Sequence, residues 1–405
     1  MIFLLLFVSI IILSFCFKLD KSKGKDCFIF SAPTVIIFLI TIIDFDKYSK
    51  GIMSKASYDI TDLTIYVYLF FIISYLLSFL VVYILTTKDT KMSINTLRVK
   101  YDEKKLDKAI KILFLFSLIS LFFNLSNVGF NVTEMTTNAR GYEVTFGKYW
   151  FINYIYFLHV VVLILVVFYS KLYRVKLSNV IIFILMIISS MFHGIKFTVF
   201  DAVFFTFFSF VVLSGGLTFK VKLYFTLVIS LFIFFFAWFS FNIRGGAEDF
   251  DILAFVNYIA PNFINYFYEI ESKNIYLGYP FDGVLGFITL HIPLLRELPV
   301  VDFQLNDKYN MLTGIPFIFA YFGPLGIVIF YTSTMYLVYY MKKKNTLVSL
   351  YVISYVYFCY FMMFYSYYFG TKYKYVYLLL VFVILEKYLR NKDAVVDNHT
   401  SLQCK

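Results

Sequence analysis

The sequence predicts an all-α, polytopic integral membrane protein with about eleven transmembrane helices and one large external loop that contains interfacial helices. Of the 405 residues, 61% are hydrophobic and 15% are charged. The mean hydropathy is +0.80, which excludes an ordinary soluble globular fold. Apolar runs long enough to cross about 30 Å of hydrocarbon recur along the whole chain. Because lipid offers the backbone no hydrogen-bond partners, and the short alternating segments of a barrel are missing, we expect helices.

The expected spans fall on both sides of one long polar segment. Those before it are residues 1–17, 27–43, 63–85, 112–125, 149–169, 180–192, 197–213 and 223–241, and those after it are 315–341, 346–369 and 375–388. The sequence therefore divides into residues 1–242 with the first helices and short loops, the external loop 243–314, the last helices over 315–388, and a cytoplasmic tail over 389–405.

The distribution of basic residues predicts how these helices are oriented. With the amino terminus outside, alternate connections place about two thirds of the 36 Lys and Arg residues on the inner side, and most of the 25 Asp and Glu residues on the outer side. Residues 243–314 then face outward. The net charge of +11 reflects topology and attraction to anionic membrane lipids, and we expect no nucleic-acid partner.

The loop over residues 243–314 is polar and punctuated by Pro and Gly. Between Ile252 and Phe267, apolar residues recur every three or four positions, which predicts a helix lying in the membrane interface. The apolar stretch 284–295, associated with Pro280 and Pro293, is too short to span and indicates an interfacial or re-entrant element. Together they would cover a cavity that suits a lipid-linked substrate. The alternative is a simple cap over the helix bundle.

Arginine is concentrated on the outer side. Of six arginines, Arg140, Arg244 and Arg296 fall in outward segments. The planar guanidinium binds two phosphate oxygens at once, whereas an ammonium acts as a point charge. Arg140 and Arg244 each precede a glycine, which we expect to let the backbone turn sharply and approach a ligand. Ordinary interfacial anchoring is the alternative for each arginine.

Polar residues elsewhere on the outer side are further candidates. His193 begins a tight turn that ends at Lys196, and Asp201 lies about one turn into the next helix, so Lys196 could pair with it. The alternative is a locally satisfied pair that steadies a hairpin. His291, in an apolar stretch, could be a general base or a hydrogen-bond partner, although a lone histidine is more often structural. Glu248 could supply a base or neutralise Arg244.

No CxxC, HExxH, Walker or GxGxxG motif is present, so we expect no metal and no nucleotide cofactor. Asp44-Phe45-Asp46 has the form of a metal-binding acidic pair. That form would suit a polyprenyl-phosphate-sugar glycosyltransferase, but Lys47 and Lys50 lie beside it.

The close of the loop, Tyr309-Asn310-Met311-Leu312-Thr313, is followed by Tyr321-Phe322-Gly323-Pro324-Leu325-Gly326. Together with the Arg-Gly context of Arg244 and the Phe- and Tyr-rich multi-helix topology, this pattern resembles the Wzy-type O-antigen and capsular polysaccharide repeat-unit polymerases. Members often have an acidic residue before the Gly pair, where this chain has Tyr321-Phe322.

The resemblance implies a metal-independent glycosyltransferase of the bacterial cytoplasmic membrane that joins undecaprenyl-pyrophosphate-linked oligosaccharides on its outer face. Its partners would be these lipid-linked glycans, membrane lipids and a chain-length regulator protein. Arg140 and Arg244 would bind pyrophosphate, and His291 or a loop acid would lie near the attacking hydroxyl. Substrate contacts would come from Arg296, Asn310, Thr313, Lys196 and Glu248. An O-antigen ligase and a non-enzymatic polysaccharide flippase remain alternatives.

Overall fold

The computed structural model describes residues 91–193, 196–215, 314–361 and 373–391, together with the single positions Phe7, Ile10, Ile11, Ser14, Leu77 and Val81. Every regular element in this part of the chain is an α-helix, and one isolated bridge joins Tyr101 to Arg390. The all-α class is therefore confirmed here. The expected spans 27–43 and 223–241 and the loop 243–313 lie outside the described residues, and the spans 1–17 and 63–85 are described only at single positions.

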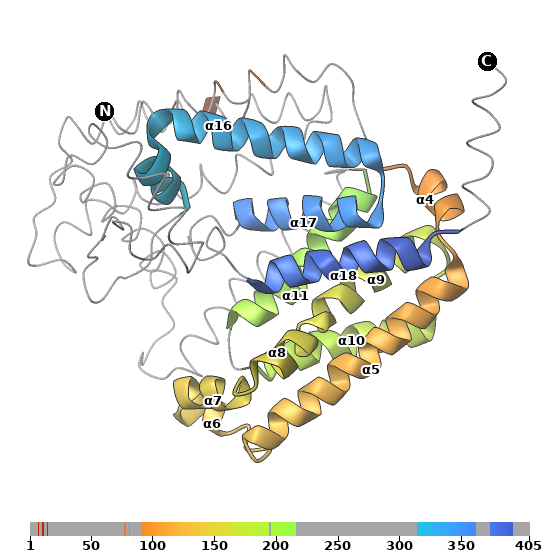
Figure 1. The fold of residues 1–405 in the computed structure, drawn as a ribbon, viewed down its shortest axis with the longest axis vertical. Helices are drawn as coiled ribbons and strands as arrows, with labels where there is room; N and C mark the ends of the chain where they lie inside the picture. Colours follow the sequence, from red (N-terminus) through yellow and green to blue (C-terminus); the bar gives the residue numbers. More distant parts are fainter. Residues whose placement is uncertain are drawn as a thin grey trace, which may run out of the picture. The chain divides into compact units, whose positions relative to one another are not determined.

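The described helices alternate with short connections (Figure 1). They are α4 (Ile94–Lys100), α5 (Glu103–Asn127), α6 (Glu134–Thr137), α7 (Ala139–Phe146), α8 (Trp150–Tyr156), α9 (Leu158–Leu172), α10 (Leu177–Met191), α11 (Lys196–Leu213), α16 (Gly314–Lys344), α17 (Leu347–Phe361) and α18 (Tyr373–Leu389).

Two stretches of the described chain are long and apolar enough to cross a membrane. They are α5 and the segment Trp150–Leu172, which joins α8 to α9. The apolar helices Leu177–Met191, Thr198–Leu213 and Leu347–Phe361 are shorter. The chain is thus all-α in its described part, with two helices of membrane-spanning length and several shorter apolar ones, and the total of eleven spans stays a prediction.

Helix α5 begins nine residues before the apolar run that predicted it. Asp102 caps its amino terminus by accepting a hydrogen bond from the backbone N–H of Lys105 at 3.0 Å. Glu103 then places a negative charge in the first turn, where it interacts favourably with the helix dipole. The apolar run marks only the part of the helix suited to hydrocarbon, so hydropathy alone misses these first polar turns.

The span predicted at 149–169 is divided into α8 and α9 at Phe157. Val160 donates its backbone N–H to the carbonyl of Phe157 at 3.1 Å, which tightens the turn there. The side chain of His159 contacts the carbonyl of Tyr156, with 2.8 Å between Nδ1 and O. Neither Pro nor Gly occurs between Tyr149 and Tyr169, so the sequence carries no breaker that would have predicted this division.

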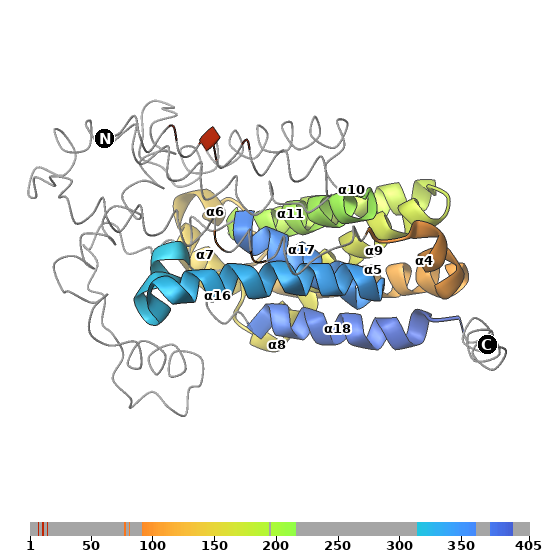
Figure 2. The ribbon, with the colours of Figure 1, turned by 90° about the horizontal axis from the view of Figure 1, so that it is seen from above.

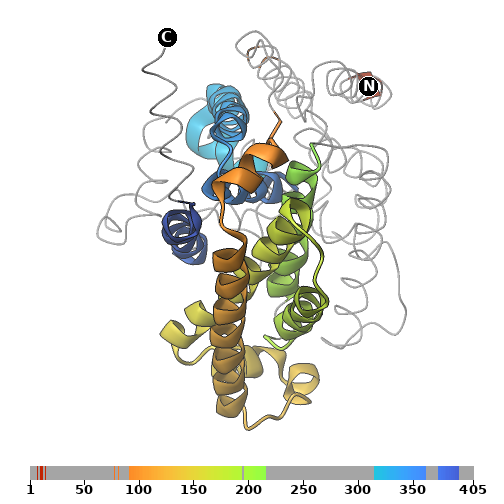
Figure 3. The same cartoon turned by 90° about the vertical axis from the view of Figure 1, so that its right-hand side faces the viewer.

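Contacts divide the chain into two compact units, each described by itself. The second unit comprises Thr90–Phe250, Tyr340–Phe358 and Lys372–Lys405. Its core is α9, which is buried along almost its whole length and packs on α5, α10 and α11. Figures 2 and 3 show α10 and α11 on one side of α5 and α18 on the other. An apolar helix buried on all faces supplies the core that holds these elements together.

The connections that carry most of the basic residues in the described part of the second unit meet at one end, which we call the basic end. It comprises residues 91–103, 171–176, 214–215, 342–347 and 386–391. The hydroxyl of Tyr173 donates to the carbonyl of Tyr101 at 2.6 Å, and Lys100 Nζ donates to the carbonyl of Asn345 at 3.3 Å. All these connections are ones that the charge distribution assigns to the cytoplasm, so the helix directions agree with the predicted alternation.

A buried carboxylate fixes this end. Glu386 Oε2 accepts hydrogen bonds from the Tyr101 hydroxyl at 2.6 Å and from the backbone N–H of Leu347 at 2.9 Å. Arg390 pairs with its other oxygen, Oε1, at 2.9 Å. Burial and the neighbouring carboxylate raise the pKa of Tyr101 above its usual value. The carboxylate thus joins α18 to the amino terminus of α17, whose free N–H groups favour a negative charge.

The first unit is described mainly through α16 up to Tyr339. There the Thr334 hydroxyl contacts the Tyr360 hydroxyl, and the rings of Tyr331 and Tyr360 lie 5.2 Å apart between centroids. The Tyr321–Gly326 motif that carried the family resemblance lies within the backbone of α16.

Candidate functional site

The end of the second unit opposite the basic end holds a group of buried and partly buried polar side chains, which we call the polar cluster. Its members come from the turns and helix ends around α8, α9, α10, α11 and α18. They are His159, His193, Thr198, Asp201, Lys374 and Tyr375. In the predicted topology this end faces outward.

Asp201 and Lys374 form the ionic centre of the cluster. Asp201 is only 1% exposed, and its carboxylate pairs with the Lys374 ammonium through Oδ2. Its other oxygen, Oδ1, accepts a hydrogen bond from the Tyr375 hydroxyl at 2.9 Å. Removing two charges from water costs several kcal/mol each, so such a pair persists only where further hydrogen bonds satisfy it. Tyr375 supplies one of these bonds.

Two aromatic rings complete the environment of the Lys374 ammonium. Nζ lies 4.9 Å from the ring centroid of Phe157 and 4.8 Å from that of Tyr375. A ring face attracts a cation electrostatically, and more strongly where water is excluded. The ammonium is therefore held between one carboxylate and two π faces near the amino-terminal ends of α9, α11 and α18.

His193 lies in the connection between α10 and α11 and is buried among aromatic rings. Nδ1 lies 2.7 Å from the Thr198 hydroxyl oxygen, and the ring centroids of Phe146 and Tyr156 lie 5.2 and 5.6 Å away. Burial lowers the pKa of His193 to about 3, and the charges of Lys374 and His159 add to this effect. Near neutral pH His193 is uncharged and acts as a hydrogen-bonding group.

His159 leaves one nitrogen unused. Its ring is fully buried, and a carbonyl can only accept, so in the neutral ring Nδ1 carries the proton that it gives to Tyr156. Nε2 is then a bare acceptor, and it has no hydrogen-bond partner among the described residues. A buried acceptor without a partner is where a water molecule or a ligand hydroxyl group would be stabilised.

The short helix α7, which carries Arg140, packs beside the cluster. The Tyr142 hydroxyl donates to the carbonyl of Phe192, next to His193, at 2.8 Å. Burial raises the pKa of Tyr142 to about 12, so this hydroxyl keeps its proton and remains a donor. The backbone of Arg140 therefore lies two residues from a group that contacts the turn holding His193.

The Asn138–Gly141 segment differs from the expected sharp turn. Gly141 is a helical residue of α7, and its backbone N–H donates to Asn138 Oδ1 at 3.1 Å. A Cβ atom at Gly141 would collide with the Asn138 side chain. The glycine here makes room for the helix cap, and the expectation of a sharp turn is wrong for Gly141.

The structure locates two of the predicted site residues by backbone. Arg140 is the second residue of α7 and Lys196 is the first of α11, and their side chains lie outside the description. The others all lie beyond the described residues: Arg244, Glu248, His291, Arg296, Asn310 and Thr313.

Sequence reasoning identified Asp201 and His193 but missed their neighbours. Lys196 was the expected partner of Asp201, whereas the described partners are Tyr375 and Lys374, the latter 173 positions away in the chain. No local spacing could reveal that pairing. The sequence does contain a signal for His159. It is the one side chain in the apolar stretch 158–170 that can carry a positive charge.

No protein-family model, curated protein or solved structure matches this chain. Within the described ranges, no group of three or more His, Cys, Asp or Glu side chains could hold a metal ion. The groups left available in the polar cluster are a neutral histidine and an unused acceptor, which suit hydroxyl-rich groups.

Proposed function

We propose that this chain is a multi-pass protein of the bacterial cytoplasmic membrane that polymerises undecaprenyl-pyrophosphate-linked oligosaccharide repeats on its outer face. The observation that carries the proposal is the polar cluster, in which the Asp201–Lys374 pair and the imidazoles of His159 and His193 are buried. Ionisable residues inside a membrane bundle are costly and mark functional sites. The segment carrying Arg140 lies at the same end.

The reaction needs positive charge for two pyrophosphates and hydrogen-bonding groups for sugars. Arg140 and Arg244 are assigned to pyrophosphate, with Arg296 as an auxiliary, because a preorganised guanidinium stabilises the charge that develops on the leaving group. His291 is assigned to the attacking hydroxyl. Sugar and loop contacts are assigned to Asn310, Thr313, Lys196 and Glu248.

The polar cluster adds hydrogen-bonding chemistry to this scheme. The unused Nε2 acceptor of His159 suits a sugar hydroxyl. His193 is uncharged, so it adds no positive charge that would draw phosphate away from the arginines. A chain-length regulator protein is proposed as a further partner.

Substitution of the arginines tests the proposal. Arg140→Ala and Arg244→Ala should each lower polymer formation about ten- to hundredfold, and the corresponding lysine variants should fail to restore it, because the bidentate phosphate contact is lost. The measurement is glycan laddering from a deletion strain that carries each variant, with membrane levels checked by immunoblot. Lys273→Ala is the control. Full-length ladders from both Arg→Lys variants would show that charge alone suffices.

The buried ion pair also favours a second candidate, a polysaccharide flippase, in which charged residues inside the helices line a substrate path. The two functions differ in the phenotype of a deletion strain. Loss of the polymerase leaves single repeats displayed at the surface, whereas loss of a flippase leaves lipid-linked repeats on the cytoplasmic side. Loss of an O-antigen ligase would leave the undecaprenyl-linked polymer intact.

A further inference from the structure

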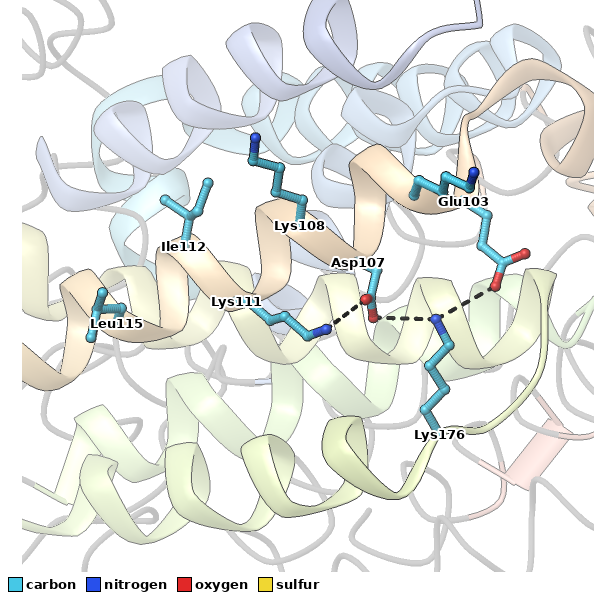
Figure 4. Close-up of a pocket in the computed structure, with 8 residues that line it drawn as sticks. Glu103, Asp107, Lys108, Lys111, Ile112, Leu115 and Lys176 are labelled. Carbon is cyan, nitrogen blue, oxygen red and sulfur yellow. Dashed lines mark hydrogen bonds and ion pairs between the residues drawn. The ribbon is translucent and has the colours of Figure 1, made fainter.

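A pocket of about 460 Å³ lies at the basic end of the second unit, away from the polar cluster. It is formed by the first turns of α5 and by Lys176, which precedes α10. In Figure 4, Asp107 and Lys111 point toward Lys176, while Lys108 and Ile112 point to another side of α5. The lining residues are Glu103, Lys104, Asp107, Lys108, Lys111, Ile112, Leu115 and Lys176.

The two carboxylates of the pocket are already paired. Asp107 binds Lys111 at 2.8 Å and Lys176 at 3.5 Å. Glu103 lies 3.6 Å from Lys176 and accepts a hydrogen bond from the Tyr169 hydroxyl at 2.6 Å. The hydrogen bond that Lys176 donates to the Tyr169 hydroxyl oxygen raises the pKa of Lys176, and the two carboxylates contribute less, so this lysine stays charged.

Lys104 and Lys108 have no ion pair among the described residues. They lie four positions apart on α5 and therefore share one face of the helix. Both are exposed. With the acidic residues neutralised by Lys111 and Lys176, the pocket carries excess positive charge at its polar half, and this charge is available to an anion.

The same face of α5 becomes apolar immediately beyond these lysines. Ile112 and Leu115 line the pocket and are 41% and 57% exposed, and Ile119 and Phe122 continue the exposed row at helical spacing. Four positions separate Lys108 from Ile112, which is about 6 Å along the helix axis. A cationic site followed by an apolar strip matches the shape of an amphiphile with an anionic headgroup and an acyl chain.

We propose that this pocket binds an anionic phospholipid, with the headgroup phosphate at Lys104 and Lys108 and an acyl chain along Ile112, Leu115, Ile119 and Phe122. The charge distribution assigns this end to the cytoplasmic side, where anionic lipids attract basic residues at the membrane surface. The apolar strip distinguishes a lipid from free phosphate. Lipid bound here contacts α5 and the start of α10 and ties the bundle to the inner leaflet.

Native mass spectrometry of the purified full-length protein tests this site, with dioleoylphosphatidylglycerol and dioleoylphosphatidylcholine as probes. Wild type should retain the anionic lipid in preference to the neutral one. K104Q/K108Q should weaken that retention at least about tenfold, because two surface cations are lost. The matched control, K343Q/K344Q, removes two exposed lysines at the same end that do not line the pocket, and it should retain the lipid as wild type does.

Three further measurements separate lost binding from lost folding and a lipid from free phosphate. Without added lipid, K104Q/K108Q should melt at the wild-type temperature, which separates lost binding from lost folding. Leu115→Asn should also weaken retention, and millimolar inorganic phosphate should not displace the lipid. Equal retention by K104Q/K108Q and wild type, or displacement by phosphate alone, would overturn the proposal.

Discussion

For Asp201, the sequence predicted that the carboxylate is paired but did not predict its partners. Its position inside an apolar helix predicted that it must be paired, and the structure confirms the pairing with Lys374 and Tyr375. The identity of the partner depended on how α11 and α18 pack. Tertiary contacts of this kind have no periodicity in sequence, so Lys374 and Tyr375 could not be assigned to the site beforehand, whereas His193 could.

Breaking the ion pair from one side should be far more harmful than removing it altogether. Asp201→Asn leaves the buried Lys374 ammonium without its counter-charge, and we expect about 3–5 kcal/mol of destabilisation. Asp201→Asn combined with Lys374→Met removes both charges and should recover much of that loss. The measurement is thermal unfolding of the purified variants in detergent, analysed as a double-mutant cycle. Additive losses would mean that the two residues are not coupled.

At the scale of the element, hydropathy predicted helices better than helix ends. The runs 197–213 and 375–388 correspond closely to α11 and α18, because apolar residues fill these helices almost from end to end. Hydropathy failed for α5, whose capped first turns are polar, and for the division between α8 and α9, which no Pro or Gly marks in the sequence. The long span expected at 346–369 is described only as far as Phe361.

The cap of α7 provides a test at this scale. Gly141→Ala should destabilise α7, because the new Cβ collides with the Asn138 side chain and displaces a cap worth about 1 kcal/mol. In an Asn138→Ala background the collision is gone, and the same change should stabilise the helix by up to about 1 kcal/mol, since alanine is the better helix former.

Hydrogen exchange of the amides in 139–147 would report both effects. The account of this motif requires the sign of the Gly141→Ala effect to reverse between the two backgrounds. The same sign in both would show that Asn138 does not determine the need for glycine.

For the whole molecule, the structure and the charge distribution agree on helix direction within the second unit. Connections predicted to be cytoplasmic meet at the basic end, while α6, α7 and the polar cluster lie at the other. Which of these two ends faces the cytoplasm stays a prediction from the excess of Lys and Arg on one side. The external loop over 243–314, which carries most of the predicted site residues, lies largely outside the described residues.

Accessibility of paired cysteines tests the orientation. Val99 on α4 and Val144 on α7 are 67% and 69% exposed, so they form a matched pair at opposite ends. In a background without native cysteines, Val144→Cys should react with a membrane-impermeant maleimide in spheroplasts, and Val99→Cys should react only after permeabilisation. The reverse pattern would invert the topology and move the polar cluster to the cytoplasm.

The central claim is that the outer end of this protein transfers glycan from one lipid pyrophosphate to another. The most direct measurement reconstitutes the purified full-length protein in liposomes with undecaprenyl-pyrophosphate-linked repeats and follows both products. We expect lipid-linked glycans of increasing length, with one undecaprenyl pyrophosphate released for each repeat joined, and about ten- to hundredfold less of both with Arg244→Ala. Movement of single repeats across the bilayer without any lengthening would contradict the claim and identify a flippase.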